Sequence, residues 1–208
     1  MIKCIIFDLD GVLCDLVQVH RHALDSALLE ICGYTISEYE FWRYYNGIPS
    51  NVKLQMLVNR GILDPKDKEK VWKLKQDNTI NAIKSCLSLD TQKIELHTYL
   101  RSKNYKLICV SNSIRNTIEL ALRQTGQLEF MEFFLGNEDF GIKPKPDPYC
   151  YCLAIEKIKL NTQECLIIED SEKGITAAIK SGAHVLEVKN PKYVTIENIE
   201  RKVKNANI

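Results

Sequence analysis

The chain has 208 residues, of which 45% are apolar, and 28 basic residues nearly balance 27 acidic ones. This length and composition can bury one full core and leave room for an inserted subdomain. The balanced charge argues against binding to nucleic-acid polymers or anionic membranes, and no apolar run is as long as a membrane span. Lys3 and Asp8 interrupt what would be the apolar region of a signal peptide, so we expect a cytoplasmic protein.

The chain contains eight cysteines, but their spacing does not indicate a zinc site or a disulfide framework. None of them forms a Cys-x-x-Cys pair. Cys4, Cys109 and Cys165 lie within or beside apolar runs, where cysteine behaves as a small apolar residue. We therefore expect packing roles for the cysteines.

The first informative segment is the apolar run Cys4–Phe7, which is typical of a fully buried strand. Asp8 and Asp10 follow it, and Gly11 provides a turn. Open α/β sheets bind ligands where their strands end, and side chains two residues apart on a strand point the same way. Two carboxylates in one space need a shared proton or a cation, for which Mg²⁺ is suitable. Taken alone, the segment equally fits a strand followed by an Asp-Gly turn.

Three later segments place polar residues at the ends of apolar runs or between prolines. They are Leu107–Ser113, Gly141–Pro148 and Leu166–Ala178. Together with Asp8-Leu9-Asp10-Gly11 they match, in order, the four motifs of the haloacid dehalogenase-like hydrolases. The chain resembles this superfamily, most of whose members are phosphatases, from Cys4 to about Leu186.

The hydrophobic pattern divides the chain into two parts. Helical periodicity fills most of residues 16–84, and after the first strand no further strand is predicted until Tyr105. From there strands and helices alternate, which indicates right-handed crossovers and a parallel sheet. We predict an α/β fold with a Rossmann-like parallel sheet core, residues 1–15 and 87–208, and an inserted all-helical cap, residues 16–86. The resemblance favours a lid over the active site, although the amphipathic helices also fit a dimerisation module.

The resemblance assigns roles to the two acids of the first motif. It implies that Asp8 is the nucleophile, which forms an aspartyl-phosphate. It implies that Asp10 is the general acid for the leaving group and the general base for water. Because the dehalogenase and phosphonate-cleaving branches lack an acid at the position of Asp10, the resemblance favours phosphoester hydrolysis.

The second and third motifs are expected to bind the phosphoryl group. Ser111 and the amides of Asn112 and Ser113 lie before a predicted helix, whose N-terminus favours an anion. The alternative is that this segment only caps the helix. In the third motif, the resemblance makes Lys143 the catalytic lysine that pairs with Asp8, and we expect Lys145 to be solvated or on the rim.

The fourth motif is expected to complete a metal site. By resemblance, Asp170 binds Mg²⁺ together with Asp8 and the backbone carbonyl of Asp10, and Glu169 binds it directly or through water. The alternative is that Glu169 and Asp170 cap the helix that follows. Paired acids at the end of a buried strand nevertheless need a cation.

The sequence says less about the substrate. His20 and Lys75 match positions that contact the leaving group in the resembled sugar-phosphate enzymes, although His20 also fits an ordinary helix surface. The loop Asn46–Asn51 lacks the cation that a phosphosugar mutase carries there, because it contains no Arg or Lys. We therefore expect a phosphatase acting on a small phosphorylated metabolite such as a sugar, polyol or nucleoside phosphate, as a monomer or homodimer. A phosphosugar mutase and a non-catalytic binding protein are the alternatives.

Overall fold

The computed structural model describes residues 1–141 and 143–206, which form two compact units. The core unit consists of residues 1–15 and 88–208, and the helical unit of residues 16–87. The boundary predicted from the sequence lay one residue earlier, after residue 86.

The core unit is built on a five-stranded sheet in the order β3-β2-β1-β4-β5. Every neighbouring pair of these strands is parallel, which confirms the predicted α/β class with a parallel sheet. The strands are β1 (Cys4–Phe7), β2 (Lys106–Val110), β3 (Phe133–Leu135), β4 (Cys165–Glu169) and β5 (His184–Glu187).

The register of the sheet brings the polar strand ends together. β1 is the central strand, and Phe7 pairs with Cys109 on β2 and with Ile168 on β4. Asp8 therefore leaves the sheet level with the ends of both neighbours. The carboxyl ends of three adjacent strands meet at one edge, as the apolar runs in the sequence predicted.

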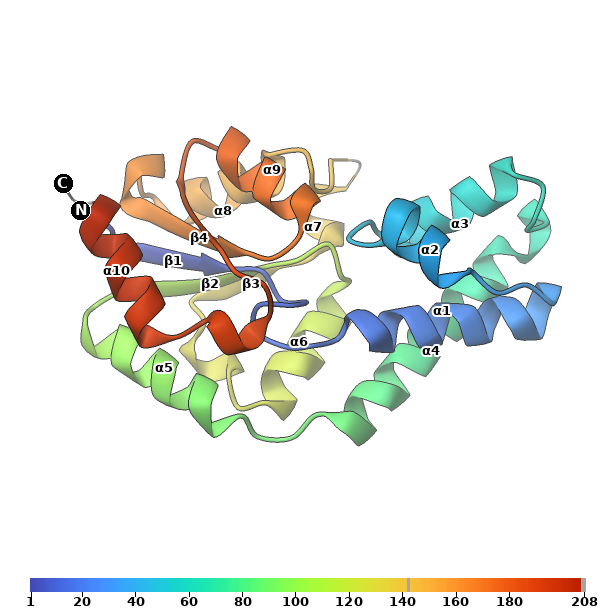
Figure 1. Ribbon diagram of the computed structural model, residues 1–208, viewed down its shortest axis with the longest axis horizontal. Coiled ribbons are helices and arrows are strands. Elements are labelled where there is room, and N and C mark those ends of the chain that lie inside the picture. The colour runs from blue at the N-terminus through green and yellow to red at the C-terminus, as the bar shows by residue number, and fades with distance from the viewer. Residues whose placement is uncertain (142, 207–208) are drawn as a thin grey trace. The chain divides into compact units, whose positions relative to one another are not determined.

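Helices cover both faces of the sheet (Figure 1). On one face, α8 (Tyr149–Ile158) and α9 (Glu172–Lys180) pack on alternate strand residues such as Ile6, Ile108 and Ile167. Residues between these point to the opposite face, where Phe7 contacts His97 on α5. The helices of that face are α5 (Thr91–Ser102), α6 (Arg115–Gln124) and α10 (Ile196–Ala206).

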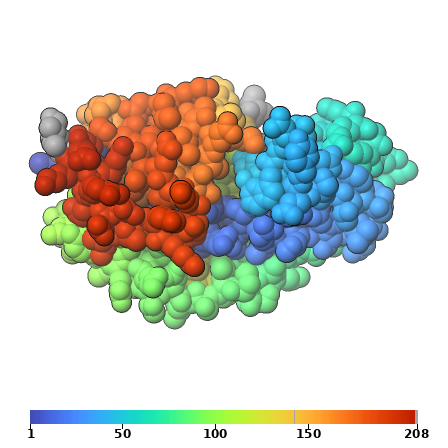
Figure 2. All heavy atoms as spheres, viewed as in Figure 1, coloured from blue at the N-terminus to red at the C-terminus, as the bar shows by residue number. Residues whose placement is uncertain are grey.

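The C-terminal helix is attached to the core unit by both apolar and polar contacts. α10 buries Ile199 and Val203, and its atoms (red) lie beside α5 (green) in the space-filling view of Figure 2. The buried ammonium group of Lys93 donates to the carbonyl oxygens of Pro191 and Val194, at 2.6 and 3.2 Å. These bonds satisfy two carbonyls of the segment that leads into α10.

The helical unit has a core of its own. α1 (Val17–Cys32) packs along α4 (Lys68–Cys86), and α3 (Ser50–Asn59) packs against α4. Their shared core contains residues of α1, α3, α4 and the segment between α1 and α3, including Leu24, Leu28, Phe41, Tyr45, Leu54, Leu57 and Val71. No helix among residues 1–141 and 143–206 is both long enough and apolar enough to cross a membrane.

Two short elements differ from the sequence prediction. Within the helical periodicity of residues 16–84, the pattern over residues 37–45 predicts one helix, but the structure has a turn of α-helix, α2 (Glu38–Glu40), followed by a π-helix at Phe41–Tyr45. The π-helix is closed by a bond of 2.8 Å from the amide of Asn46 to the carbonyl of Phe41. α7 (Asn137–Phe140), directly after β3, was not predicted, because four residues are too few for helical periodicity to appear.

Candidate active site

Asp8 is held by a lysine, but not by the one predicted. The Nζ atom of Lys145 donates to Asp8 Oδ1 at 2.5 Å, to Glu169 Oε1 at 2.6 Å and to the carbonyl of Val110 at 2.9 Å. Lys145 is only 3% exposed. Three acceptors use all three N–H groups of the ammonium, so the lysine is held in one position.

The prediction that Lys143 pairs with Asp8 is therefore wrong. Lys143 is exposed, and its ammonium lies 5.0 Å from the centre of the Tyr149 ring. The physical reason is the backbone around Lys145: Asn112 Oδ1 accepts from the amide of Lys145 at 3.1 Å, and Asn112 Nδ2 donates to its carbonyl at 3.4 Å. These bonds direct the second lysine, not the first, toward the end of β1.

Glu169 is the centre of the buried polar network. It is 0% exposed, and Oε1 accepts from Lys145 Nζ and from the hydroxyl of Tyr151, each at 2.6 Å. Oε2 accepts from the amides of Asp170 and Ser171, at 3.1 and 3.4 Å. The prediction placed Glu169 at the end of the strand, and the structure includes it as the last residue of β4.

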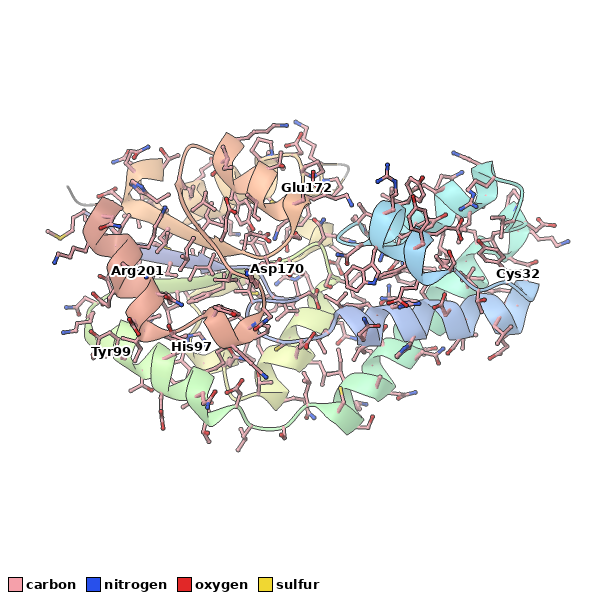
Figure 3. The ribbon with its side chains drawn as sticks, in the orientation of Figure 1. Cys32, His97, Tyr99, Asp170, Glu172 and Arg201 are labelled. Carbon is pink, nitrogen blue, oxygen red and sulfur yellow. The ribbon has the colours of Figure 1, made fainter. Side chains whose placement is uncertain are left out.

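Asp170 lies just beyond the carboxyl end of β4 and is labelled in Figure 3. Gly11 faces it so closely that a Cβ there would be 2.0 Å from Asp170 Oδ2, and Gly11 has a φ of +89°. Any side chain at Gly11 would displace this carboxylate and strain the backbone. The glycine of the first motif is therefore required by both the turn and the fourth motif.

The three carboxylates can hold a metal ion. Asp8, Glu169 and Asp170 each offer an oxygen, and these oxygens lie within 4.8 Å of one another. Oδ1 of Asp170 is buried and has no hydrogen-bond partner among the described residues. A carboxylate oxygen without a partner, in a cluster of acids, fits a hard divalent cation such as Mg²⁺.

The electrostatics of the cluster support the same conclusion. Burial raises the pKa of Asp8 well above its usual range, Lys145 opposes this, and the neighbouring carboxylates raise it further. Burial, followed by Glu169 and Asp10, raises the pKa of Asp170 to about 7. Burial lowers the pKa of Lys145, but Asp8 and Glu169 reverse this and hold it above its ordinary value. A bound cation would favour the ionised carboxylates.

Asp10 lies on a tight turn after β1. The amides of Leu13 and Cys14 both donate to the carbonyl of Leu9, at 3.0 and 2.9 Å. The hydroxyl of Ser113, at the end of the second motif, donates to Asp10 Oδ2 at 3.0 Å. Sequence reasoning did not assign a role to the side chain of Ser113. The metal ligation predicted for the backbone carbonyl of Asp10 stays a prediction.

The second motif forms a loop between β2 and α6. Ser111 is buried, and its Oγ accepts from the amide of Ser113 at 3.0 Å, which leaves its own O–H available as a donor. The alternative, that this motif caps α6, does not hold in the structure. The residue before α6 is Ile114, and the amide of Arg115 donates instead to the carboxylate of Glu138 at 2.9 Å.

The capping alternative for the fourth motif holds in part. Ser171 caps α9, because its Oγ accepts from the amide of Gly174 at 3.1 Å. Glu169 accepts from two backbone amides just before that helix, whereas the carboxylate of Asp170 takes no part in the cap. Asp170 is therefore the more available ligand of the two acids.

The two residues predicted to contact the substrate meet within the helical unit. Lys75 Nζ lies 3.2 Å from His20 Nδ1, and Lys75 is 4% exposed. α4 carries the lysine and α1 the histidine. Lys75 and His20 therefore form a polar pair inside the helical unit, and the role of this pair toward a substrate stays a prediction.

Sequence reasoning missed Lys145, Tyr151 and the link from Ser113 to Asp10. A signal for the first was present, since Lys-Pro-x-Pro occurs in two overlapping registers, starting at Lys143 and at Lys145. The second register places Tyr151 six residues after its lysine, on the buried face of α8. The contact between Ser113 and Asp10 has no local signal, because 103 residues separate the two.

Residues 2–182 match the family model of the haloacid dehalogenase-like hydrolases. The chain belongs to this family. The predicted family and the prediction of a hydrolase are thereby confirmed.

The relatives and the fold agree with this assignment. The chain is 27% identical over 183 residues to a phosphorylated carbohydrates phosphatase of Thermotoga maritima, with 86% of this chain and 82% of that protein covered. It is 27% identical over 192 residues to a phosphoglycolate phosphatase of Vibrio cholerae, with 88% and 82% covered. The crystal structure of a β-phosphoglucomutase from Clostridium difficile matches 99% of this chain, and 98% of that one, with a TM-score of 0.83 and 22% identity. At that identity the match concerns the fold.

Proposed function

We propose that the protein is a magnesium-dependent phosphomonoesterase that acts on a small phosphorylated metabolite through an aspartyl-phosphate on Asp8. One observation carries the proposal: the buried ammonium of Lys145 holds Asp8 at the carboxyl edge of the sheet, beside the carboxylates of Glu169 and Asp170. Membership of a hydrolase family and relatives named phosphatases support it.

The first half of the reaction transfers the phosphoryl group to the protein. Lys145 engages Oδ1 of Asp8, so Oδ2 is the oxygen that attacks phosphorus. As the new P–O bond forms, the ester P–O bond breaks, and Asp10 gives its proton to the leaving oxygen. Ser111 donates to a phosphoryl oxygen, and Lys145 offsets the negative charge that accumulates.

The second half releases inorganic phosphate. Asp10, now ionised, takes a proton from water as the water oxygen attacks phosphorus. The bond between phosphorus and Asp8 Oδ2 breaks, which restores both carboxyl groups. Ser113 keeps Asp10 in place through both steps, because its hydroxyl donates to Oδ2 of that residue.

A magnesium ion would be held by Asp170, Asp8 and Glu169, and when bound it would neutralise charge on the phosphoryl oxygens. The crowding of three carboxylates and the buried Oδ1 of Asp170 support this assignment. The choice of a sugar, polyol or nucleoside phosphate as substrate, with His20 and Lys75 as contacts for the leaving group, rests on the family resemblance.

The test is phosphate release from a panel of phosphorylated metabolites, with protein freed of metal by a chelator and then supplied with Mg²⁺. We expect activity only after Mg²⁺ is restored. Asp8→Asn should abolish turnover, because an amide is a very poor nucleophile, while Asp15→Asn, the same change at an exposed position, should retain it. Substantial phosphate release by folded Asp8→Asn protein would refute the assignment of Asp8 as the nucleophile.

The same preparation separates the alternatives. A hexose monophosphate with a trace of the bisphosphate is supplied, and isomerised sugar and free phosphate are both followed. Isomerisation faster than phosphate release would contradict the proposed phosphatase activity and would favour a phosphosugar mutase. Binding of phosphate esters without any turnover in the presence of Mg²⁺ would indicate a non-catalytic binding protein.

A further inference from the structure

Tyr151 joins the polar network from behind the candidate site, and the proposed mechanism does not use it. It lies on α8 and is 0% exposed, and its hydroxyl donates to Glu169 Oε1 at 2.6 Å. The ammonium of Lys145 lies 4.8 Å from the centre of its ring, which is within the range of a cation–π contact. Tyr151 therefore contacts both Lys145, which holds Asp8, and Glu169, which is one of the three candidate metal ligands.

The carboxylate of Glu169 is fixed by partners on different elements. Tyr151 on α8 and Lys145 before α8 both donate to Oε1, and the amides of Asp170 and Ser171 donate to Oε2. If the hydroxyl of Tyr151 were removed, Oε1 would keep a single donor. The carboxylate could then rotate, and Lys145 would lose one of the restraints that set its position against Asp8.

Packing alone does not account for a hydroxyl at this position. The buried neighbours of Tyr151 on α8 are Cys150, Ala154 and Ile155, which belong to an apolar cluster against the sheet. Phenylalanine would fill the same volume without a polar atom. A buried hydroxyl is costly unless it is bonded, and this one is bonded to Glu169.

We propose that Tyr151 is a positioning residue for the reaction: its hydroxyl fixes Glu169 and, through Glu169, both the lysine that faces Asp8 and the geometry of the metal ligands. The inference rests on the proposed function. It adds a residue outside the four motifs that does not touch the substrate.

Tyr151→Phe tests the inference, because this change deletes one oxygen and keeps the ring. Tyr45→Phe is the matched control, since Tyr45 is also fully buried and bonded, to Arg60 Nη1 at 2.7 Å, but belongs to the helical unit. We expect kcat of Tyr151→Phe to fall by about 10-fold or more, with KM changed less than about twofold. The control should keep both values.

A second measurement does not depend on turnover. Mn²⁺ binding to substrate-free protein, followed by electron paramagnetic resonance, should be weakened by about 10-fold in Tyr151→Phe and unchanged in Tyr45→Phe. Unaltered kcat together with unaltered Mn²⁺ affinity would overturn the inference, as would a loss of the fold, which would assign the hydroxyl to the core. If the wild-type protein hydrolysed no phosphate ester, the proposed function would fail, and the Mn²⁺ comparison would still decide the role of Tyr151.

Discussion

The two lysines of the third motif show how one residue can be misassigned while its motif is recognised. Lys143 and Lys145 each begin a Lys-Pro-x-Pro segment, so the pattern alone does not choose between them. What decides is a contact from another motif: the side chain of Asn112 bonds to both the amide and the carbonyl of Lys145. A residue 33 positions away therefore determines which ammonium reaches Asp8.

The distinction is testable by replacing each lysine with methionine, which has a similar length and no charge. Lys145→Met should lower kcat by at least about 10²-fold, as expected for the loss of a charged group that stabilises the transition state. It should also lower the free energy of unfolding, by about 3–5 kcal/mol, because buried carboxylates lose their partner. Lys143→Met should change both quantities little, since that side chain is exposed. Steady-state kinetics and urea denaturation provide the measurements. A greater loss of kcat in Lys143→Met than in Lys145→Met would restore Lys143 as the catalytic lysine.

Among the elements, those with strong patterns were predictable from the sequence. β1, β2 and β4 each contain an unbroken run of apolar residues, and the meeting of the polar residues that follow these runs is expected because parallel strands end at one edge. The π-helix Phe41–Tyr45 and the single turn of α7 were not predictable, because each is shorter than two helical turns. Their conformations depend on contacts with the rest of their own unit.

The approach of α9 to β4 gives a prediction about an element. A Cβ at Gly174 would lie 1.9 Å from Glu169 Oε1, and that carboxylate cannot move without losing its bonds to Lys145 and Tyr151. Gly174→Ala should therefore lower the free energy of unfolding by about 1–3 kcal/mol, although alanine favours helices. It should also reduce kcat.

The control for this helix is Ile179→Ala, at a position that is 60% exposed. It should change the free energy of unfolding by less than about 0.5 kcal/mol. Chemical denaturation of both variants supplies the comparison. A Gly174→Ala protein as stable as the wild type would mean that Glu169 is free to shift.

For the whole molecule, the sequence predicted where the site lies but not how its parts contact one another. Asp8, Ser111 and Asp170 follow strands that are adjacent and parallel, so their proximity was a consequence of the predicted topology. The bond from Ser113 to Asp10 joins the second motif to the first, and the bond from Tyr151 to Glu169 joins a residue outside the motifs to the fourth. They depend on how α8 and the loop after β2 pack, which no local pattern determines.

The stability of the whole molecule should depend on His97, which lies on α5 and is buried against β1. Its Nε2 lies 2.8 Å from Gln127 Oε1, it contacts Phe7, and burial lowers its pKa to about 4. At pH values between about 6.5, the pKa of an unfolded histidine, and about 4, the unfolded chain binds a proton at His97 and the folded chain does not. The free energy of unfolding therefore falls as the pH is lowered through this window, by up to about 3 kcal/mol.

In urea denaturation at pH 7 and pH 4.5, His97→Gln should be less stable at pH 7 and should lose less stability on acidification than the wild type. His22→Gln, at an exposed position, should keep the wild-type difference. An equal loss in His97→Gln would show that other groups cause the acid sensitivity.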